Sequence, residues 1–138
     1  MKIGEWDELG RARALLQRQI GELKADEYAA HVAVNPESGR LRILVASDVG
    51  LLDYQYSPAG ANPEGAWILR GQLHRWASIR GLRLQTDAQL DESNDEVQEI
   101  WRLVAEEPKI ELAATTDGGP RAIDGLLAFA RACLMHAG

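Results

Sequence analysis

The basic residues of segment 65–86 are the clearest group of side chains in this sequence that could bind a ligand. The segment contains no acidic residue. Its basic residues are Arg70, His74, Arg75, Arg80 and Arg83. A guanidinium group offers paired N–H donors that match the oxygens of a phosphate or a carboxylate. The four arginines therefore predict a patch for an anionic group, without a metal or a cofactor.

Residues 87–99 carry the opposite charge. This segment contains no basic residue, and its acids are Asp87, Asp91, Glu92, Asp95, Glu96 and Glu99. Charged segments that follow one another along a chain commonly cover its surface or pair with each other. Both interpretations of the arginines, a binding patch and an ordinary solvated surface, remain open at this point.

Cys133 and His136 lie three residues apart, a spacing at which two side chains of one helix can share a ligand. Two ligands make a poor zinc site, because structural zinc takes four. We therefore expect Cys133 to be a buried thiol. Trp67, Trp76 and Trp101 could line a ligand groove, but such rings more often pack in a core or at its rim, and we expect that role.

The segment Gly118-Gly119-Pro120 favours the entry of a helix over an anion cradle, because the Lys-Ser/Thr of a phosphate-binding loop is missing. No Gly-x-Ser-x-Gly, His-Glu-x-x-His or Cys-His constellation occurs. We therefore name no catalytic residue and do not expect an enzyme. An enzyme with an unrecognised site would need two carboxylates, or a carboxylate and His74, that converge in a cleft.

Length and composition limit the class of protein. The 138 residues suit a single domain, 1–138, and the net charge of −6 argues against nucleic acid as the main partner. One cysteine excludes an internal disulfide and favours a reducing compartment. The first residues lack the apolar core of a signal peptide, and no apolar run approaches the ~20 residues that cross a bilayer. We expect a cytoplasmic protein.

Helical periodicity marks both ends of the chain. Residues 8–24 predict a helix, with Asp7 as its N-cap. Its apolar stripe is Leu9, Ala12, Leu16, Ile20 and Leu23. Residues 119–136 predict a second helix, with Pro120 in its first turn. Its expected buried stripe is Ile123, Leu126, Leu127, Ala130, Cys133 and Leu134.

Residues 27–115, between the two helices, predict an antiparallel sheet. Period-two patterns indicate strands at 28–34, 41–45, 52–56, 67–74, 78–86, 96–106 and 109–114. The expected loops include residues 57–65 and an acidic surface loop at 87–95. Residues 96–106 fit helical spacing as well as strand spacing, and we favour the strand.

The order of helix, seven strands and helix resembles the pleckstrin-homology-like (PH-like) domains of bacterial proteins. In that family a strand ends in a Thr/Ser-Asp turn and the next strand opens with Gly-Leu-Leu, as in Val45-Ala46-Ser47-Asp48-Val49-Gly50-Leu51-Leu52. The resemblance covers about residues 27–136. It implies an α+β fold, a bent seven-stranded antiparallel barrel or sandwich that a C-terminal helix caps, with residues 1–25 as an extra helix. Many eukaryotic members carry a tryptophan in the last helix, where this chain has Phe129.

The resemblance also bears on ligands. Lipid-binding PH domains use a basic residue late in the first strand and a [Lys/Arg]-x-Arg pair on the second. Arg40-x-Arg42 matches the second part and adds two arginines to the candidate site. The first part is missing, since the first strand ends in Val34-Asn35 and Glu37 lies in the loop. The sequence therefore matches only one of the two parts of the lipid-binding pattern, and membrane lipid remains a possible partner on that part alone.

Three functions remain open. The first is a non-enzymatic interaction module of PH-like fold that binds a protein partner or a second copy of itself through open strand edges. The second resembles the secretion chaperones, which are small, acidic and dimeric and bind a client polypeptide. It requires a helix within residues 63–75. The third is a domain that binds an anionic ligand, either a lipid headgroup or a phosphate.

Overall fold

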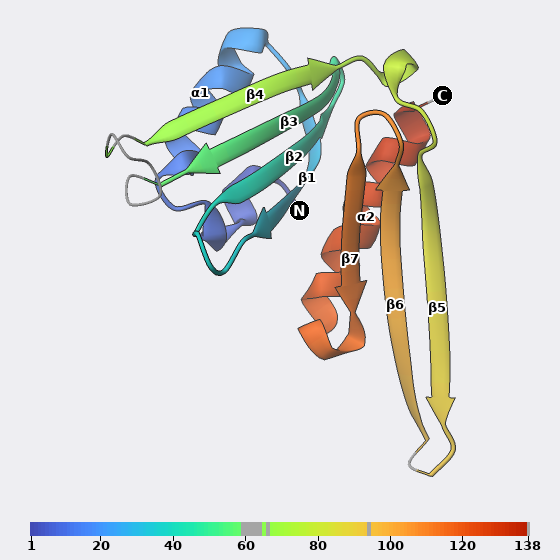
Figure 1. Cartoon of the computed structure of the whole chain (residues 1–138). Coiled ribbons are helices and arrows are strands. Elements are labelled where there is room, and N and C mark those ends of the chain that lie inside the picture. Colours follow the sequence, from blue (N-terminus) through green and yellow to red (C-terminus); the bar gives the residue numbers. More distant parts are fainter. Residues whose placement is uncertain (59–64, 66, 94, 138) are drawn as a thin grey trace. The chain divides into compact units, whose positions relative to one another are not determined.

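The computed structural model describes residues 1–58, 65, 67–93 and 95–137 (Figure 1). The chain divides into two units, Met1–Trp76 and Ala77–Gly138, and we describe each by itself. Seven strands and two α-helices make up most of the described chain. The expectation of a single domain stays a prediction. Most of the loop expected at 57–65 lies outside the described residues.

The first unit holds a four-stranded antiparallel sheet in the order β1-β2-β3-β4. Its strands are β1 (Glu27–Val34), β2 (Leu41–Ser47), β3 (Gly50–Ser57) and β4 (Ile68–His74). The predicted strands at these four places are confirmed. The turn between β1 and β2 is held by Asn35, whose side-chain oxygen accepts the N–H groups of Glu37 and Ser38.

Strand β4 also decides one of the open alternatives. The chaperone-like arrangement requires a helix within residues 63–75, but Ile68–His74 is a strand paired with β3 along its whole length. Strand β4 lies at the edge of the sheet, and most of its polar side chains are exposed to solvent. Residues 68–74 therefore do not form the helix that the chaperone-like alternative requires.

One face of the first sheet packs against helix α1 (Ala12–Leu23). Leu41, Ile43 and Val45 of β2 point to this face, as their alternation predicts, and all three are buried. Leu16 and Ile20 of α1 belong to the same cluster. Burial of this apolar face is the main favourable term in the stability of the first unit.

The start of the N-terminal helix differs from the prediction. Residues 1–11 form two short 3₁₀ turns, η1 (Ile3–Glu5) and η2 (Asp7–Leu9), before α1 begins. Gly10 adopts φ 50°, which ends the 3₁₀ turn, so Asp7 is not the N-cap of α1. Leu9, Leu16 and the other members of the expected stripe are buried, but Leu23 is 44% exposed.

The second unit holds a three-stranded antiparallel sheet in the order β5-β6-β7, followed by the C-terminal helix. These elements are β5 (Arg83–Asp91), β6 (Glu96–Ala105), β7 (Ile110–Thr115) and α2 (Pro120–His136). Short 3₁₀ turns precede β5 (η4, Trp76–Ser78) and α2 (η5, Thr116–Gly118). The favoured strand over residues 96–106 is confirmed, and the last helix lies where it was predicted.

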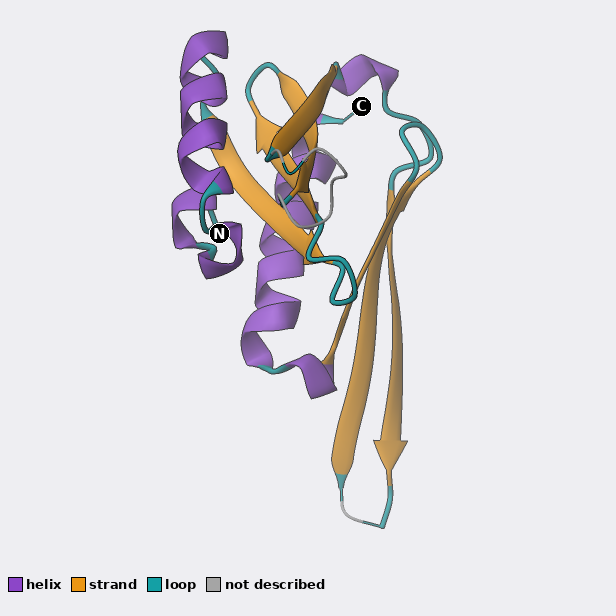
Figure 2. Cartoon of the chain, turned by 60° about the vertical axis from the view of Figure 1, so that its left-hand side comes forward, coloured by secondary structure: helices purple, strands orange, loops and turns teal. Residues whose placement is uncertain are grey.

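Strand β5 corrects two predictions. It does not cover 78–86 but Arg83–Asp91, and residues 87–91 of the expected acidic loop belong to it. The reason is its partner: β6 pairs with β5 in register along the full strand, so that Leu90 faces Val97. The ribbon of β5 and β6 extends past the last paired residue of β7, as Figures 1 and 2 show.

Helix α2 packs on β7 and β6. Leu126, Ala130 and Cys133 of its predicted stripe are buried, whereas Ile123 and Leu127 are half-buried. Phe129, which was not part of that stripe, is also buried, as are Leu103 and Leu112 of the sheet. Leu134 was expected in this stripe but is 42% exposed, because it lies at the margin of the helix face. Burial raises the pKa of the Cys133 thiol to about 12, which confirms the prediction of a buried thiol.

The α+β class and the antiparallel arrangement of all seven strands are confirmed. Within the described residues the strands form two sheets of four and three strands, and a single closed barrel is not confirmed.

Candidate functional site

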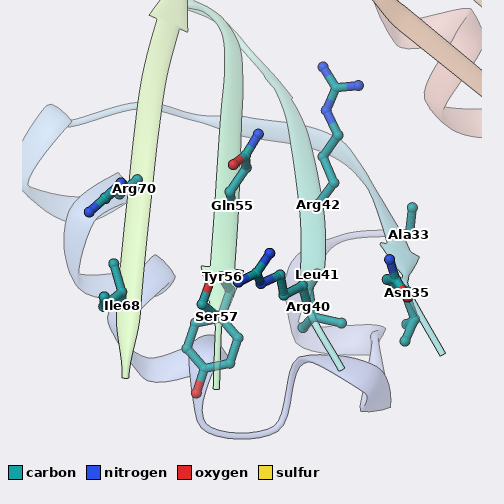
Figure 3. A pocket seen from close by; sticks show the side chains of 11 residues that line it. Ala33, Asn35, Arg40, Leu41, Arg42, Gln55, Tyr56, Ser57, Ile68 and Arg70 are labelled. Atoms are coloured by element: carbon teal, nitrogen blue, oxygen red, sulfur yellow. The ribbon is translucent and has the colours of Figure 1, made fainter. Parts of the chain in front are cut away.

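A cavity of about 620 Å³ lies at the end of the first sheet where β1 turns into β2 (Figure 3). It is the place where the largest number of the predicted arginines come together. Its lining residues are Ala33, Val34, Asn35, Arg40, Leu41, Arg42, Gln55, Tyr56, Ser57, Ile68 and Arg70. Three of the six predicted site residues are among them.

The register of the four strands explains how residues distant in sequence reach this cavity. Ala33 pairs with Arg42, Arg42 with Gln55, and Gln55 with Arg70. Residues directly opposite each other on neighbouring strands share one face of a sheet. This row therefore lies on the face opposite to Ile43, away from the α1 side.

Arg42 is held in place by Asp53 of β3. Its Nε lies 3.1 Å from Asp53 Oδ1, and its Nη2 lies 2.8 Å from Asp53 Oδ2. Both side chains are partly buried, 30% and 15% exposed, so solvent screens this two-pronged pair less than an exposed one. Asp53 also offsets the positive charge of Arg42, and Arg40 and Arg70 add two further guanidinium groups to the lining of the cavity.

Arg40 and Arg70 are both exposed. Figure 3 shows that the three guanidinium groups point in different directions: Arg42 away from Arg40, and Arg70 outward from β4. The side chain of Gln55 lies between those of Arg42 and Arg70. The sheet thus brings the three arginines to one cavity, but their guanidinium groups do not point to one place. To bind an anion between them, Arg40 and Arg70 must rotate their long side chains.

The other predicted site residues lie elsewhere. Arg75 follows β4 and does not line the cavity. Arg80 belongs to the second unit, where its backbone pairs with Glu107. Arg83, also in the second unit, lies with its Nη1 3.8 Å from Glu106 Oε1. A boundary between the two units falls inside the basic segment 65–86.

Sequence reasoning did not find the neutral polar groups of the cavity, Asn35, Gln55 and Ser57. No spacing along the chain brings these three together. The signal that unites them is the pairing register of β1 to β4, which a single sequence does not supply. With that register known, the two-residue spacing of Arg40 and Arg42 predicts that both side chains lie on the same face of the sheet as Gln55 and Arg70.

The tryptophans show packing roles. Trp67 stacks on Tyr56 with ring centroids 5.7 Å apart, and Arg11 lies 5.2 Å from the centroid of the same indole. Trp76 donates its indole N–H to the carbonyl of Ser47 over 2.9 Å. Trp101 belongs to the second unit, where its indole N–H donates to Glu99 Oε2 over 3.0 Å. These contacts place the rings at the margins of the two cores.

Burial shifts the pKa values of two titratable groups of the first sheet. It raises the pKa of the Tyr56 phenol, and the charge of Arg11 opposes that effect. It lowers the pKa of His31 to about 4, with a smaller contribution in the same direction from the positively charged N-terminus. Both groups are consequently neutral at pH 7.

The described residues contain no cluster of three or more His, Cys, Asp or Glu side chains that could hold a metal ion. No helix in the described part of the chain combines the length and apolar character needed to span a membrane.

Comparisons with protein-family models, with curated proteins and with solved structures found no match to this chain.

Proposed function

We propose that this chain is a non-enzymatic binding module of PH-like architecture, whose ligand presents an anionic group. The observation that carries the proposal is the meeting of Arg40, Arg42 and Arg70 at one cavity of the first sheet. Arg40-x-Arg42 is also the part of the PH-like lipid-binding pattern that this sequence retains.

The order of elements supports the architecture. Four consecutive antiparallel strands are followed by three more and then by one C-terminal helix. This is the order that the PH-like resemblance implies. The assignment to that superfold, and the bent sandwich or barrel that it implies, belong to the proposal.

The chemistry of the cavity supports an anion as the ligand. Its cationic groups are guanidinium groups, which stay protonated at every physiological pH and form paired hydrogen bonds with phosphate or carboxylate oxygens. The amides of Asn35 and Gln55 and the hydroxyl of Ser57 add neutral donors. These groups bind an anion without exchanging protons with it at pH 7, as a binding module requires.

The anion could belong to a lipid headgroup or to a free phosphate. A basic residue late in the first strand, which lipid-binding PH domains use, is absent here: β1 ends in Val34, and the following Asn35 holds the turn through its side chain. The two sources share the same phosphate chemistry, so the experiment below is arranged to separate them.

The test is a titration of ¹⁵N-labelled protein with inorganic phosphate and with a soluble inositol trisphosphate. We expect amide shifts at the ends of β1, β2 and β4 around the cavity. Replacing Arg40 and Arg70 together by Ala should weaken binding at least about tenfold, since each removes a charge-assisted hydrogen bond. Arg42 is left unchanged because it pairs with Asp53.

A matched control removes the same two charges elsewhere. Arg18 on α1 and Arg121 on α2 are both exposed and do not line the cavity, so Arg18→Ala with Arg121→Ala should leave the affinity unchanged. Equal weakening by both double variants, or no shift at the cavity at millimolar phosphate, would contradict the proposal. Sedimentation with phosphoinositide vesicles, without binding of the free anions, would assign the site to a lipid surface.

A further inference from the structure

Strand β5 is an open edge of the second sheet. Among the described residues it pairs with β6 alone, so half of its backbone N–H and C=O groups face outward. Its side chains are exposed except for Leu84, which is half-buried. Such an edge is a template for pairing with another strand unless the protein protects it.

The sequence of β5 is nearly symmetric about Asp87. Leucines stand three residues to either side, at 84 and 90, and glutamines two residues to either side, at 85 and 89. At four residues to either side the chain has opposite charges, Arg83 and Asp91. A strand with this arrangement is complementary to a second copy of itself that runs in the opposite direction.

We infer that two copies of this chain associate through antiparallel pairing of β5 with β5, about a two-fold axis at Asp87. The second unit of each copy then contributes three strands to one six-stranded sheet. In this register Leu84 faces Leu90 of the second copy, and Arg83 faces Asp91 of the second copy. Each pair occurs twice because the axis repeats it.

The register follows from the alternation of the strand. A shift by one residue would set Leu84 against Asp91 and place the leucines of the two copies on opposite faces of the joint sheet. A shift by two residues would set Leu84 against Ala88 and Arg83 against Gln89, and both favourable pairs would be lost. The two Asp87 carboxylates meet at the axis, and Arg102 of the same chain, 3.6 Å from Asp87 Oδ2, offsets each of them.

The apolar face of the sheet gives a second, independent argument. Helix α2 packs on β7 and β6 and leaves a groove of about 440 Å³ beside β5. The groove is lined by Leu84, Trp101, Leu127, Arg131, Leu134 and Met135. Met135 is 75% exposed, so this apolar surface is largely uncovered in a single copy.

The tip of the β5–β6 ribbon carries two apolar side chains that would cover this groove. Leu90 and Val97 face each other across the ribbon and are 60% and 50% exposed. Leu90 lies on the same face of β5 as Leu84, because the two are separated by an even number of residues. Since Leu90 of the second copy pairs with Leu84, the tip of each ribbon reaches the groove of the other copy.

The association lies within the second unit and does not depend on the anion site of the first. Sedimentation velocity over a range of concentrations should show a monomer–dimer equilibrium. Arg83→Asp and Asp91→Arg should each raise the dimer dissociation constant about tenfold, because each sets like charges against each other twice. The double variant Arg83→Asp/Asp91→Arg exchanges the charges and should return the constant to within about threefold of the original.

Cysteine cross-linking tests the register directly. Only position 87 faces itself across the axis, at a Cα separation of about 5 Å, which suits a disulfide. Asp87→Cys should therefore form a covalent dimer under mild oxidation. The native Cys133 does not compete, because it is buried.

Gln85→Cys is the matched control, since it lies on the same strand and the same face. Its two copies would be about 14 Å apart at a rise of ~3.4 Å per residue, so it should not cross-link. A monomer at all concentrations, a dimer that ignores the charge reversals, or equal cross-linking at positions 85 and 87 would overturn the inference. Circular dichroism verifies that each variant is folded.

Discussion

Strands β2 and β5 show how differently one chain can use two strands of similar length. In β2 (Leu41–Ser47) every residue is buried except Arg42, which is half-buried, and the strand lies between β1 and β3. In β5 (Arg83–Asp91) every residue is exposed except Leu84, which is half-buried, and the strand lies at an edge. The central strand gains its stability from apolar burial, whereas the edge strand depends on ladder hydrogen bonds and cross-strand pairs.

This difference explains which parts of each unit are buried in its core and which parts remain exposed to solvent. The first unit packs α1 against the face of β2 that bears Ile43. The second unit packs α2 mainly on β7 and β6, and β5 is exposed along its length except at the half-buried Leu84. Substitutions in the covered regions should therefore change stability, and those in the uncovered regions should change association.

The largest expected effect is on the core of the second unit. Phe129→Ala removes a fully buried ring and should lower the free energy of unfolding by about 3–5 kcal/mol. Met135→Ala, on the same helix but 75% exposed, should change it by less than about 0.5 kcal/mol. Urea denaturation followed by circular dichroism measures both. Equal losses would mean that α2 does not bury the Phe129 face.

The contrast between β2 and β5 can be tested with one residue from each strand. Ile43→Ala should cost about 2–5 kcal/mol of unfolding free energy, because Ile43 is fully buried. Leu90→Ala should cost less than about 0.5 kcal/mol in dilute protein, because Leu90 is 60% exposed. The same Leu90 variant should weaken self-association. A large stability loss at position 90 in the monomer would remove the distinction between the two strands.

Acid should destabilise the first unit through His31. Its pKa is about 4 in the folded chain, below the usual 6.5, so the unfolded chain binds the proton more readily. Stability should therefore be intact above pH 6.5 and fall by about 1–3 kcal/mol as the pH falls towards 4. Unfolding of the protein and of His31→Gln at pH 7, 5.5 and 4.5 measures this loss.

Glu27 acts in the opposite direction. Burial raises the pKa of its carboxyl, so protonation of Glu27 favours the folded chain at the acidic end of the range. Protonation of Glu27 offsets part of the loss that His31 causes, and the His31→Gln variant should lose less stability between pH 6.5 and 5 than the original chain. An unchanged slope in that interval would mean that another group causes it.

The smallest effect concerns the ion pair at the cavity. A double-mutant cycle on Arg42→Ala and Asp53→Ala should give a coupling energy of about 1 kcal/mol, because the pair is partly buried and two-pronged. The pair of Arg18 and Glu22 on α1 is 79% and 66% exposed, and its cycle should give about 0.3 kcal/mol. Equal couplings would show that the cavity offers Arg42 no protection from solvent.

Local pattern predicted much of the secondary structure. The alternation of Leu41, Ile43 and Val45 predicted β2 and its buried face, and the stripe with Leu126, Ala130 and Cys133 predicted the buried side of α2. The pattern was wrong for residues 87–91, because a polar sequence with two exposed faces carries no burial signal. The pairing with β6 decided that segment.

The candidate site was predicted in part. Arg40, Arg42 and Arg70 were identified by residue type, but segment 65–86 was treated as one patch, although Arg80 and Arg83 belong to the second unit. Residue type indicates which side chains can bind an anion. It does not indicate which strands lie next to one another.

By itself the sequence determined the α+β class, the faces of the helices and central strands, and the burial of Cys133, because each depends on the period of apolar residues along a short segment. Tertiary structure alone decided the meeting of Arg40, Arg42 and Arg70, the division into two sheets, and the exposed edge of β5. These features depend on strand register and on which strand lies at an edge, and both are set by contacts between segments far apart in the chain.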